Sequence, residues 1–599
     1  MNFKKIISMA LTLSMVSVSA VSVVRADESE LFYEKFDMTK VKADKTDGVV
    51  KEIEVPDGDY TVTVKTGGKK ETNANVYING GERVRVYTLE AGQTQDNEQP
   101  VVPKDGKITV QVLGENPNVT EIEVKQLPDR EEKGEKTTIY IAGDSTAQTY
   151  NYATAYPQTG WGQMFGNYFT DDVVIENRSM AGRSSKSYNN DGRLDRILTE
   201  MHPGDYVFIQ FGINDGDVNK AERYISVEDY TTLITEKYMG EVEKRGGIPV
   251  LMTASAAGWW DEENNCFMES RQDYADPTRE IAKETGCAFI DINRTVTDMW
   301  NSMDKDEVIS GYFVCEPLES KAYPVGTNDT THMKPKNATL VAKMVAEAIP
   351  ESVPELAKYL KGDEVFNDIS GHWAENVIKS LAAEGIVNGV GGGKFNPDGT
   401  VTRAEFLKMA MDACEIPGHA YRWLEKSGLP SASDAWITDV TPEDWYCYYL
   451  QGALDKGLIP DAMLEGLKEA KLGEVVITEA TEDKEAVTAE AWQYEPEDLV
   501  KGIQFNGKAP ITREEMAAVA VNCMSYVAKN SDVELSPVNQ DEGDYFSDRD
   551  DIRDDYLNAV EVAYSYGVIN GMGDGTFAPD ATLTRAQASV IVNKLAAIK

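Results

Sequence analysis

The sequence predicts a multidomain chain with three successive fold classes: an N-terminal β-sandwich, a central α/β domain built on a parallel sheet, and a C-terminal all-α unit of three repeats. Short alternating runs between Gly, Asp and Asn turns fill residues 27–130. Apolar strands spaced widely enough for intervening helices fill 137–355. Beyond residue 365 the same motif recurs three times. A chain of 599 residues is also too long for one hydrophobic core.

Composition and the first residues narrow the classes of function. With 59 basic and 101 acidic side chains the net charge is −42, which argues against nucleic acid or an anionic membrane as the main partner. Within residues 1–26, Lys4 and Lys5 precede an apolar run and a small-residue cleavage site, the pattern of a signal peptide. We therefore expect a secreted protein, with an uncleaved N-terminal anchor as the alternative. No Cys-x-x-Cys pair or His–Cys cluster occurs, so we expect no metal and no cofactor.

In the N-terminal domain, the alternation of apolar and polar residues predicts antiparallel strands, and no helical period competes with it. The clearest runs are Tyr60–Lys65, Ala74–Ile78, Arg83–Tyr87, Ile108–Leu113 and Thr120–Val124. A charged stretch at 131–136 is the expected linker to the next domain.

In the central domain, short apolar runs predict the strands of a parallel sheet, and a long helical segment at 336–349 closes it. These runs are Thr138–Ala142, Val173–Asn177, Tyr206–Phe211, Pro249–Thr253 and Phe289–Ile292. Open sheets of this kind bind their ligands at the carboxyl ends of the strands. Polar residues that directly follow a strand are therefore the first candidates for a site.

Four segments of this domain together predict a serine esterase. Ser145 follows the first strand in a Gly-Asp-Ser turn, Gly182 follows the second strand, and Asn214 follows the third. Two of the four histidines lie in the repeats and a third precedes a proline, which leaves His332, with Asp329 three residues before it. A serine nucleophile needs such a base and orienting carboxylate. The Ser145 and Gly182 N–H groups and the Asn214 amide are the expected oxyanion donors.

Taken singly, these signals also have structural explanations. A Gly-Asp-Ser turn is equally typical of a serine that caps a helix, and a histidine before a helix is commonly a loop residue. Their occurrence in this order, three of them directly after predicted strands, favours the catalytic interpretation.

The four segments resemble the conserved blocks of the SGNH (GDSL-type) hydrolase family, and the resemblance, over roughly 137–350, implies a flavodoxin-like fold. Gly160–Gln163, 177–185 and Tyr206–Gly212 are similar more specifically to the rhamnogalacturonan acetylesterase branch. That branch implies a Ser-His-Asp esterase that removes acetyl groups from pectic polysaccharide. Position 213 departs from it, because the branch commonly has histidine where this chain has Ile213. The sandwich before this domain is similar to galactose-binding-like domains.

Four residues are candidate substrate contacts: Arg183, Trp161, Gln163 and Trp259. The loop at 177–190 holds three basic residues and no acid, so Arg183 is the strongest candidate for binding a sugar carboxylate. Pairing with the acidic remainder of the surface is the alternative for this arginine. Trp259 could stack on a sugar ring, although packing in the core or anchoring of a loop is the commoner role of a tryptophan.

The C-terminal repeats span 366–416, 437–528 and 546–599, and an acidic insertion at 461–509 interrupts the second repeat. Each repeat ends with Thr-Arg-x-Glu or Thr-Arg-x-Gln, the pattern of a helix capping box. The box does not explain the arginine, which places a cation at the positive end of a helix dipole.

This recurrence makes Arg403, Arg513 and Arg585 candidate ligands for an anion held between the guanidinium and the helix N–H groups. The repeats resemble S-layer homology domains. The resemblance implies non-covalent attachment to an anionic secondary polymer of the cell wall, and so a location at the cell surface.

We therefore expect a wall-tethered carbohydrate acetylesterase whose partners are an acetylated polysaccharide and a wall polymer. One alternative keeps the fold but changes the substrate to acetyl-xylan, another decorated glycan or a short-chain lipid ester. A second alternative is a structural or adhesive S-layer protein with an inactive hydrolase body, but the complete set of catalytic residues argues against it.

Overall fold

A computed structural model describes the chain in ten segments: residues 31–130, 132–361, 366–391, 393–420, 437–441, 443–464, 471–478, 486–493, 503–530 and 545–597. The predicted signal peptide at 1–26 lies outside them. The chain divides into two compact units, one comprising residues up to 130 with 190–200, the other the remainder. In the described segments, no helix has the length and apolarity that a membrane crossing requires.

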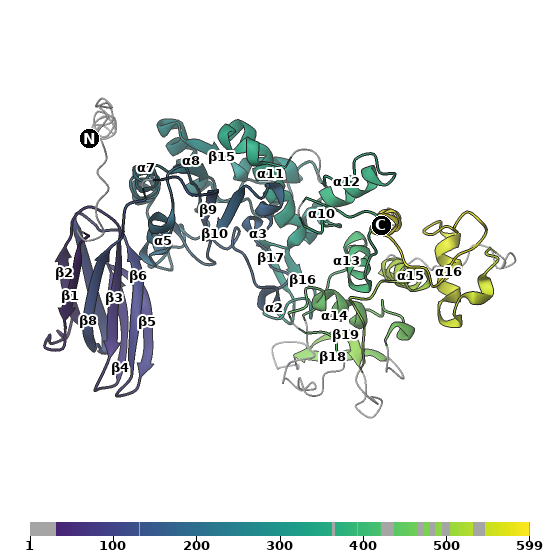
Figure 1. Cartoon of the computed structure of the whole chain (residues 1–599), viewed down its shortest axis with the longest axis horizontal. Helices are drawn as coiled ribbons and strands as arrows, with labels where there is room; N and C mark the ends of the chain where they lie inside the picture. The colour runs from purple at the N-terminus through teal and green to yellow at the C-terminus, as the bar shows by residue number, and fades with distance from the viewer. Residues whose placement is uncertain are drawn as a thin grey trace. The chain divides into compact units, whose positions relative to one another are not determined.

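The N-terminal domain is a sandwich of two antiparallel sheets (Figure 1). One sheet has the order β1 (Tyr33–Asp37), β8 (Val119–Gln126), β3 (Tyr60–Gly67), β6 (Thr94–Val101), and the other has the order β2 (Val49–Glu54), β7 (Lys107–Asn116), β4 (Thr72–Ile78), β5 (Gly81–Leu89). Valines from both sheets, such as Val62 and Val110, share one buried core.

The five strands predicted from alternation are confirmed, and three others were missed. The missed strands, β1, β2 and β6, all lie at sheet edges. An edge strand buries fewer of its side chains, and β1 and β6 are mostly exposed. Their sequences therefore lack the apolar alternation on which such a prediction depends.

The first unit also contains α5 (Arg193–Glu200). Arg83 of β5 pairs with Asp195 of this helix at 2.8 Å, and both side chains are almost completely buried.

The central sheet is fully parallel, with the order β10 (Val173–Asn177), β9 (Thr137–Gly143), β11 (Tyr206–Gln210), β12 (Ile248–Met252), β15 (Ala288–Ile290). All five predicted strands are present. Numbered within the domain, the order is 2-1-3-4-5, the doubly wound arrangement of flavodoxin-like folds. Its switch point lies between β9 and β11, so residues that follow these two strands meet there.

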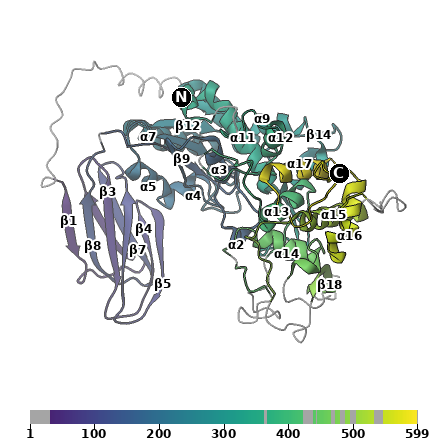
Figure 2. The same cartoon turned by 45° about the vertical axis from the view of Figure 1, so that its right-hand side comes forward.

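Helices cover this sheet, and its strands are therefore buried on both faces. Ile139 and Phe208 share a core with residues of α3 (Trp161–Phe165), α9 (Ile292–Trp300) and α11 (Pro335–Ser352). These three helices are labelled in Figure 2. Val207 and Ile209, which flank Phe208 on β11 and point to the opposite face of the sheet, are also buried. The predicted closing helix is α11. The other helices are α2 (Tyr152–Ala155), α4 (Ser185–Asn190), α6 (Val227–Thr232), α7 (Gly240–Lys244), α8 (Gln272–Thr285) and α10 (Lys305–Ser310).

The C-terminal region contains a pair of helices for each repeat. These are α12 (Glu375–Ala383), α13 (Arg403–Ala413), α14 (Cys447–Asp455), α15 (Arg513–Asn530), α16 (Asp554–Ser565) and α17 (Arg585–Ala596). The insertion in the second repeat contains an antiparallel hairpin, β18 (Lys471–Thr478) with β19 (Val487–Gln493). The prediction of an all-α unit is therefore wrong for this insertion.

An aspartate at the start of each repeat organises its turn. Asp368 accepts hydrogen bonds from the N–H groups of Phe395 and Asn396. Asp548 binds the corresponding turn of the third repeat in the same way. In the second repeat Asp439 binds residues 505 and 506, which identifies the turn that the insertion obscured in the sequence.

Candidate active site

The nucleophile candidate Ser145 lies in the turn that follows β9. The carboxylate of Asp144 holds this turn, because it accepts hydrogen bonds from the N–H (2.9 Å) and hydroxyl (2.8 Å) of Thr146. The Tyr150 hydroxyl donates to the Ser145 carbonyl at 2.9 Å. Ser145 is 5% exposed, so its hydroxyl is sheltered from bulk water.

The base and its carboxylate lie on a strand that the sequence did not predict. Asp329 and His332 belong to β17 (Thr327–Met333), which pairs with β16 (Tyr312–Cys315). Residues three apart on a regular strand point to opposite faces of the sheet. The pairing shifts register between Tyr312 and Phe313, and this bulge lets the two side chains meet.

The three side chains form a connected hydrogen-bonded line. His332 Nε2 lies 2.8 Å from Ser145 Oγ, and His332 Nδ1 lies 2.6 Å from Asp329 Oδ2. The other carboxylate oxygen of Asp329 accepts from the N–H groups of Thr331 (2.8 Å) and His332 (3.1 Å). Burial raises the pKa of Asp329, but the His332 hydrogen bond and charge outweigh it and lower that pKa to about 2. The carboxylate is therefore ionised wherever the imidazole acts as a base.

The two other expected oxyanion donors, Gly182 and Asn214, come from distant parts of the sequence that the fold brings into contact. Asn214 Nδ2 donates to the Arg183 carbonyl at 3.1 Å, so the block after β11 contacts the block after β10. An asparagine amide has a second N–H, which this hydrogen bond does not use. Gly182 has a φ of +71°, the left-handed region that glycine adopts without strain.

A buried aspartate that the sequence analysis missed holds these two blocks together. Asp215 accepts hydrogen bonds from the N–H and hydroxyl of Ser185 and from the N–H of Gly212. Burial raises its pKa to about 6, although these bonds favour the ionised form. Its position directly after Asn214 was the available signal, since a carboxylate in a tight turn commonly binds nearby backbone N–H groups.

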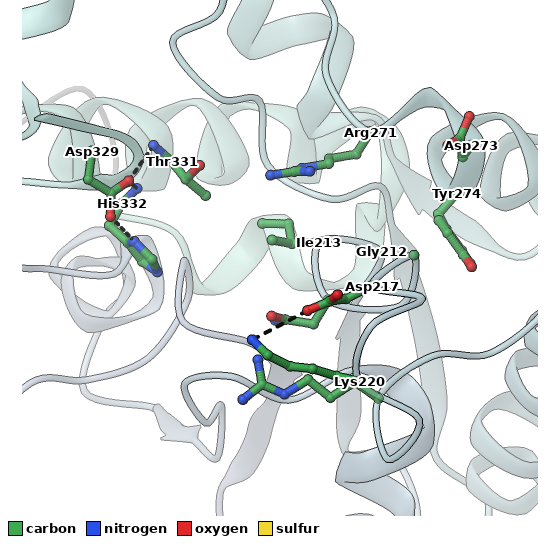
Figure 3. A pocket seen from close by; sticks show the side chains of 13 residues that line it. Gly212, Ile213, Asp217, Lys220, Arg271, Asp273, Tyr274, Asp329, Thr331 and His332 are labelled. Atoms are coloured by element: carbon green, nitrogen blue, oxygen red, sulfur yellow. Dashed lines mark hydrogen bonds and ion pairs between the residues drawn. The ribbon is translucent and has the colours of Figure 1, made fainter.

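A cavity of about 470 Å³ opens beside the catalytic line (Figure 3). It is lined by His332, Asp329, Asn214 and Ile213, the residue at which this chain differs from the acetylesterase branch. Its other lining residues are Gly212, Gly216, Asp217, Lys220, Arg223, Arg271, Asp273, Tyr274 and Thr331. The three basic residues among them were not predicted from the sequence.

Two of the four candidate substrate contacts, Trp161 and Gln163, make hydrogen bonds within the protein instead. Trp161 is completely buried, and its indole N–H donates to Gln210 Oε1 at 2.7 Å, so the prediction that it contacts substrate is wrong. The α3 helix carries it into the core under the sheet. The Gln163 Oε1 accepts from the Tyr150 N–H at 2.9 Å, which makes its contact one that shapes the loop after Ser145.

The other two candidates lie differently. Arg183 does not line the cavity, and its guanidinium approaches the Ala181 carbonyl at 3.5 Å. Trp259 is 37% exposed and its ring lies under the guanidinium of Arg271, with 4.9 Å between the guanidinium carbon and the ring centroid. Trp259 therefore neighbours a cavity-lining residue, whereas Arg183 contributes to the site through its backbone.

The predicted capping boxes are present, and the arginines that follow them lie between repeats. Arg585 donates to the carbonyls of Phe395 and Asn388 and pairs with Glu405 at 2.6 Å. Arg513 likewise donates to two carbonyls of the third repeat. Arg403 pairs with a glutamate of the second repeat.

The first N–H groups of these helices also have carbonyl partners in a neighbouring repeat. The three arginines are therefore explained by the contacts that join the repeats. Their predicted role in binding a wall polymer stays a prediction.

Comparison with known proteins assigns two parts of the chain to families. The GDSL-like lipase/acylhydrolase family model matches residues 141–309, and the S-layer homology domain model matches residues 365–407 and 545–589. The probable rhamnogalacturonan acetylesterase YesY of Bacillus subtilis is 35% identical over 209 residues, 35% of this chain and 89% of the relative. The rhamnogalacturonan acetylesterase RhgT of the same organism is 32% identical over 207 residues, 35% of this chain and 87% of the relative.

A third similarity concerns surface proteins. The surface-layer 125 kDa protein of Lysinibacillus sphaericus is 28% identical over 183 residues, 26% of this chain and 14% of that protein. With the repeats, this similarity indicates attachment to the cell surface. The chain is a serine carbohydrate esterase that carries S-layer homology domains, and it belongs to the GDSL-like lipase/acylhydrolase family, together with rhamnogalacturonan acetylesterases.

Proposed function

We propose that this esterase removes acetyl groups from rhamnogalacturonan by a Ser-His-Asp acyl-enzyme mechanism, as a secreted protein held to the cell wall by its repeats. The observation that carries the mechanism is the line from Ser145 Oγ to His332 Nε2 (2.8 Å) and from His332 Nδ1 to Asp329 (2.6 Å). The relatives named as rhamnogalacturonan acetylesterases support the substrate.

In the first half-reaction, Ser145 attacks the carbonyl carbon of the acetyl ester while His332 Nε2 accepts its proton. Asp329 keeps Nδ1–H pointed toward its carboxylate and stabilises the imidazolium that forms. The oxyanion accepts hydrogen bonds from the Ser145 and Gly182 N–H groups and the Asn214 amide. The tetrahedral intermediate then expels the sugar oxygen, which takes the proton from His332.

In the second half-reaction, water replaces the sugar. His332 accepts a proton from the water as its oxygen attacks the acetyl-enzyme, and the same donors stabilise the second oxyanion. Collapse of this intermediate returns the proton to Ser145 Oγ and releases acetate. No step needs a metal ion or a cofactor.

Attachment places this activity at the wall. The S-layer homology repeats and the similarity to a surface-layer protein support a location on the cell surface. The predicted partner is an anionic secondary wall polymer. The wall would then hold the enzyme where polymeric substrate arrives from outside the cell.

The test is acetate release from acetylated rhamnogalacturonan, acetylated xylan and p-nitrophenyl acetate by wild type and Ser145→Ala. We expect release from rhamnogalacturonan by wild type and a loss of about 10⁴-fold or more in the variant. Ser302→Ala, at an exposed serine outside the cavity, is the matched control. Folded wild-type protein that hydrolyses none of the three esters would contradict the enzyme and favour a non-catalytic surface protein. Preference for xylan would move the proposal to that substrate.

A further inference from the structure

The cavity beside the catalytic line contains an unusual number of charges. Lys220, Arg223 and Arg271, which we call the basic cluster, line it together with the carboxylates of Asp217, Asp273 and Asp329. These charges would cancel if every base had a carboxylate partner within the cavity, and they do not pair in this way.

Two of the carboxylates are engaged and the third lies aside. Asp329 is bound to His332, and Asp217 pairs with Lys220 at 3.3 Å (Figure 3). Asp273 is exposed, and Figure 3 shows it on the far side of the cavity from His332. Arg223 and Arg271 are therefore left with little compensation from the cavity wall.

Arg271 is held at the cavity without an anionic partner. Among the described residues its guanidinium makes no hydrogen bond or ion pair, and its Nε is buried without a hydrogen-bond partner. It rests on the Trp259 ring and points across the cavity toward the side that carries His332 (Figure 3). Its backbone has a φ of +57°, an uncommon conformation for a long side chain and one typical of functional positions.

Arg223 also lines the cavity, and it lies next to Gly182, one of the expected oxyanion donors. A Cβ built on Gly182 would be 3.1 Å from Arg223 Nη2, so this guanidinium borders the oxyanion loop. Its one ion pair among the described residues is with the adjacent Glu222, at 3.8 Å, and that glutamate is largely exposed. Such a loose surface pair contributes little and is readily exchanged for another anion.

The charge of Arg271 also reaches the catalytic turn. Burial raises the pKa of Asp144, the neighbour of Ser145, and the charges of His332 and Arg271 oppose that rise. This agrees with the cavity, whose wall includes both Arg271 and His332.

We infer that Arg223 and Arg271 form a carboxylate-binding subsite that selects uronate-containing polysaccharide over neutral acetylated glycans. The inference rests on the proposed function and names the part of the substrate that the site recognises. A planar carboxylate matches the two-pronged donors of a guanidinium, and partly buried arginines without a close anionic partner gain most from such a ligand. The local positive charge also offsets the −42 of the whole chain, which would otherwise repel an anionic polymer.

The experiment compares Arg223→Gln and Arg271→Gln with wild type on two forms of one polymer: acetylated rhamnogalacturonan, and the same polymer with its uronate carboxyls reduced to neutral alcohols. Glutamine keeps much of the side-chain length but removes the charge. We expect each variant to lose about 10- to 100-fold in kcat/KM on the anionic polymer, mainly through KM. On the neutral polymer and on p-nitrophenyl acetate, each variant should stay within about threefold of wild type.

Lys283→Gln, at an exposed cation on the α8 helix that Arg271 directly precedes, controls for general charge. The inference is overturned if wild type treats the two polymers equally, or if the variants lose the same factor on all three esters. Failure of the proposed function has a different signature, since wild type would then release no acetate from rhamnogalacturonan. The subsite is supported if both arginine variants lose activity on the anionic polymer but match wild type on the neutral polymer, while Lys283→Gln matches wild type on both.

Discussion

Ser145 Oγ and His332 Nε2 lie 2.8 Å apart although 187 residues separate them in the chain. The switch point of the sheet presents the serine, and a bulged hairpin presents the histidine. Neither segment contains the other half of the pair, so the catalytic contact depends on the complete α/β fold. Four predictions follow from the way that this fold holds the site and the repeats.

Asn214→Ala is expected to lower kcat by about 10²–10³-fold, because it removes one donor to the oxyanion. The variant should still fold, since the amide makes one other bond, to the Arg183 carbonyl. Steady-state kinetics with p-nitrophenyl acetate and circular dichroism measure the two expectations. Unchanged turnover in a folded variant would remove Asn214 from the oxyanion site.

Asp329→Asn is expected to change the pH dependence of stability as well as to lower turnover. The pKa of Asp329 is lowered to about 2 in the folded protein, against about 3.9 for a free aspartate. Its ionised form therefore stabilises the fold fully above about pH 4, and this stabilisation is lost as the pH falls toward 2.

The measurement is the thermal unfolding midpoint of wild type and Asp329→Asn between pH 2.5 and 7, values chosen to bracket that range (about pH 2 to 4). Wild type should be the more stable protein near neutrality, and the difference should shrink on acidification. Other carboxyl groups titrate in both proteins, so they cancel in the comparison. A difference that grows toward low pH would contradict the assigned direction.

Trp161→Phe is expected to destabilise the esterase domain without a selective effect on KM. The indole N–H is the donor to Gln210 Oε1, and leaving that buried oxygen unpaired costs about 1–3 kcal/mol. Urea unfolding of wild type and variant measures the loss. A large KM increase for polymer with unchanged stability would instead restore Trp161 as a substrate contact.

Arg585→Met is expected to destabilise the repeat unit, because two carbonyls and the Glu405 carboxylate lose their donor. The cost should be about 2–4 kcal/mol, with esterase activity on p-nitrophenyl acetate retained. Two measurements, the thermal unfolding midpoint and binding to purified cell-wall polymer, separate this structural role from polymer recognition. A variant of wild-type stability that no longer binds the wall would instead assign the arginine to the polymer.

Local signals in the sequence predicted the serine, histidine and aspartate that the fold brings together. The Gly-Asp-Ser turn, the asparagine after β11 and the Asp329–His332 pair are each short patterns whose meaning depends on adjacent residues. The central strands were equally clear, because strands buried on both faces are continuous apolar runs. Three of the four edge strands of the sandwich, β1, β2 and β6, were missed for the opposite reason.

Residue type alone gave the wrong role for Trp161, whose surroundings come from distant segments. Trp161 follows the branch motif, yet α3 turns it into the core. Arg183 lies in the basic loop, yet Arg223 and Arg271 line the cavity, and no local pattern marks either of them.

The sequence by itself thus determined the esterase class, and it predicted the order of the domains and the roles of Ser145, His332 and Asp329 as nucleophile, base and carboxylate. Only the tertiary structure decided which charges face the substrate cavity and how Asp329 reaches His332 from three residues away on a strand. The physical reason is that a reactive group must have a given chemical identity, which the chain spells out locally. Burial, pairing and direction are properties of contacts between distant segments, and these exist only once the chain has folded.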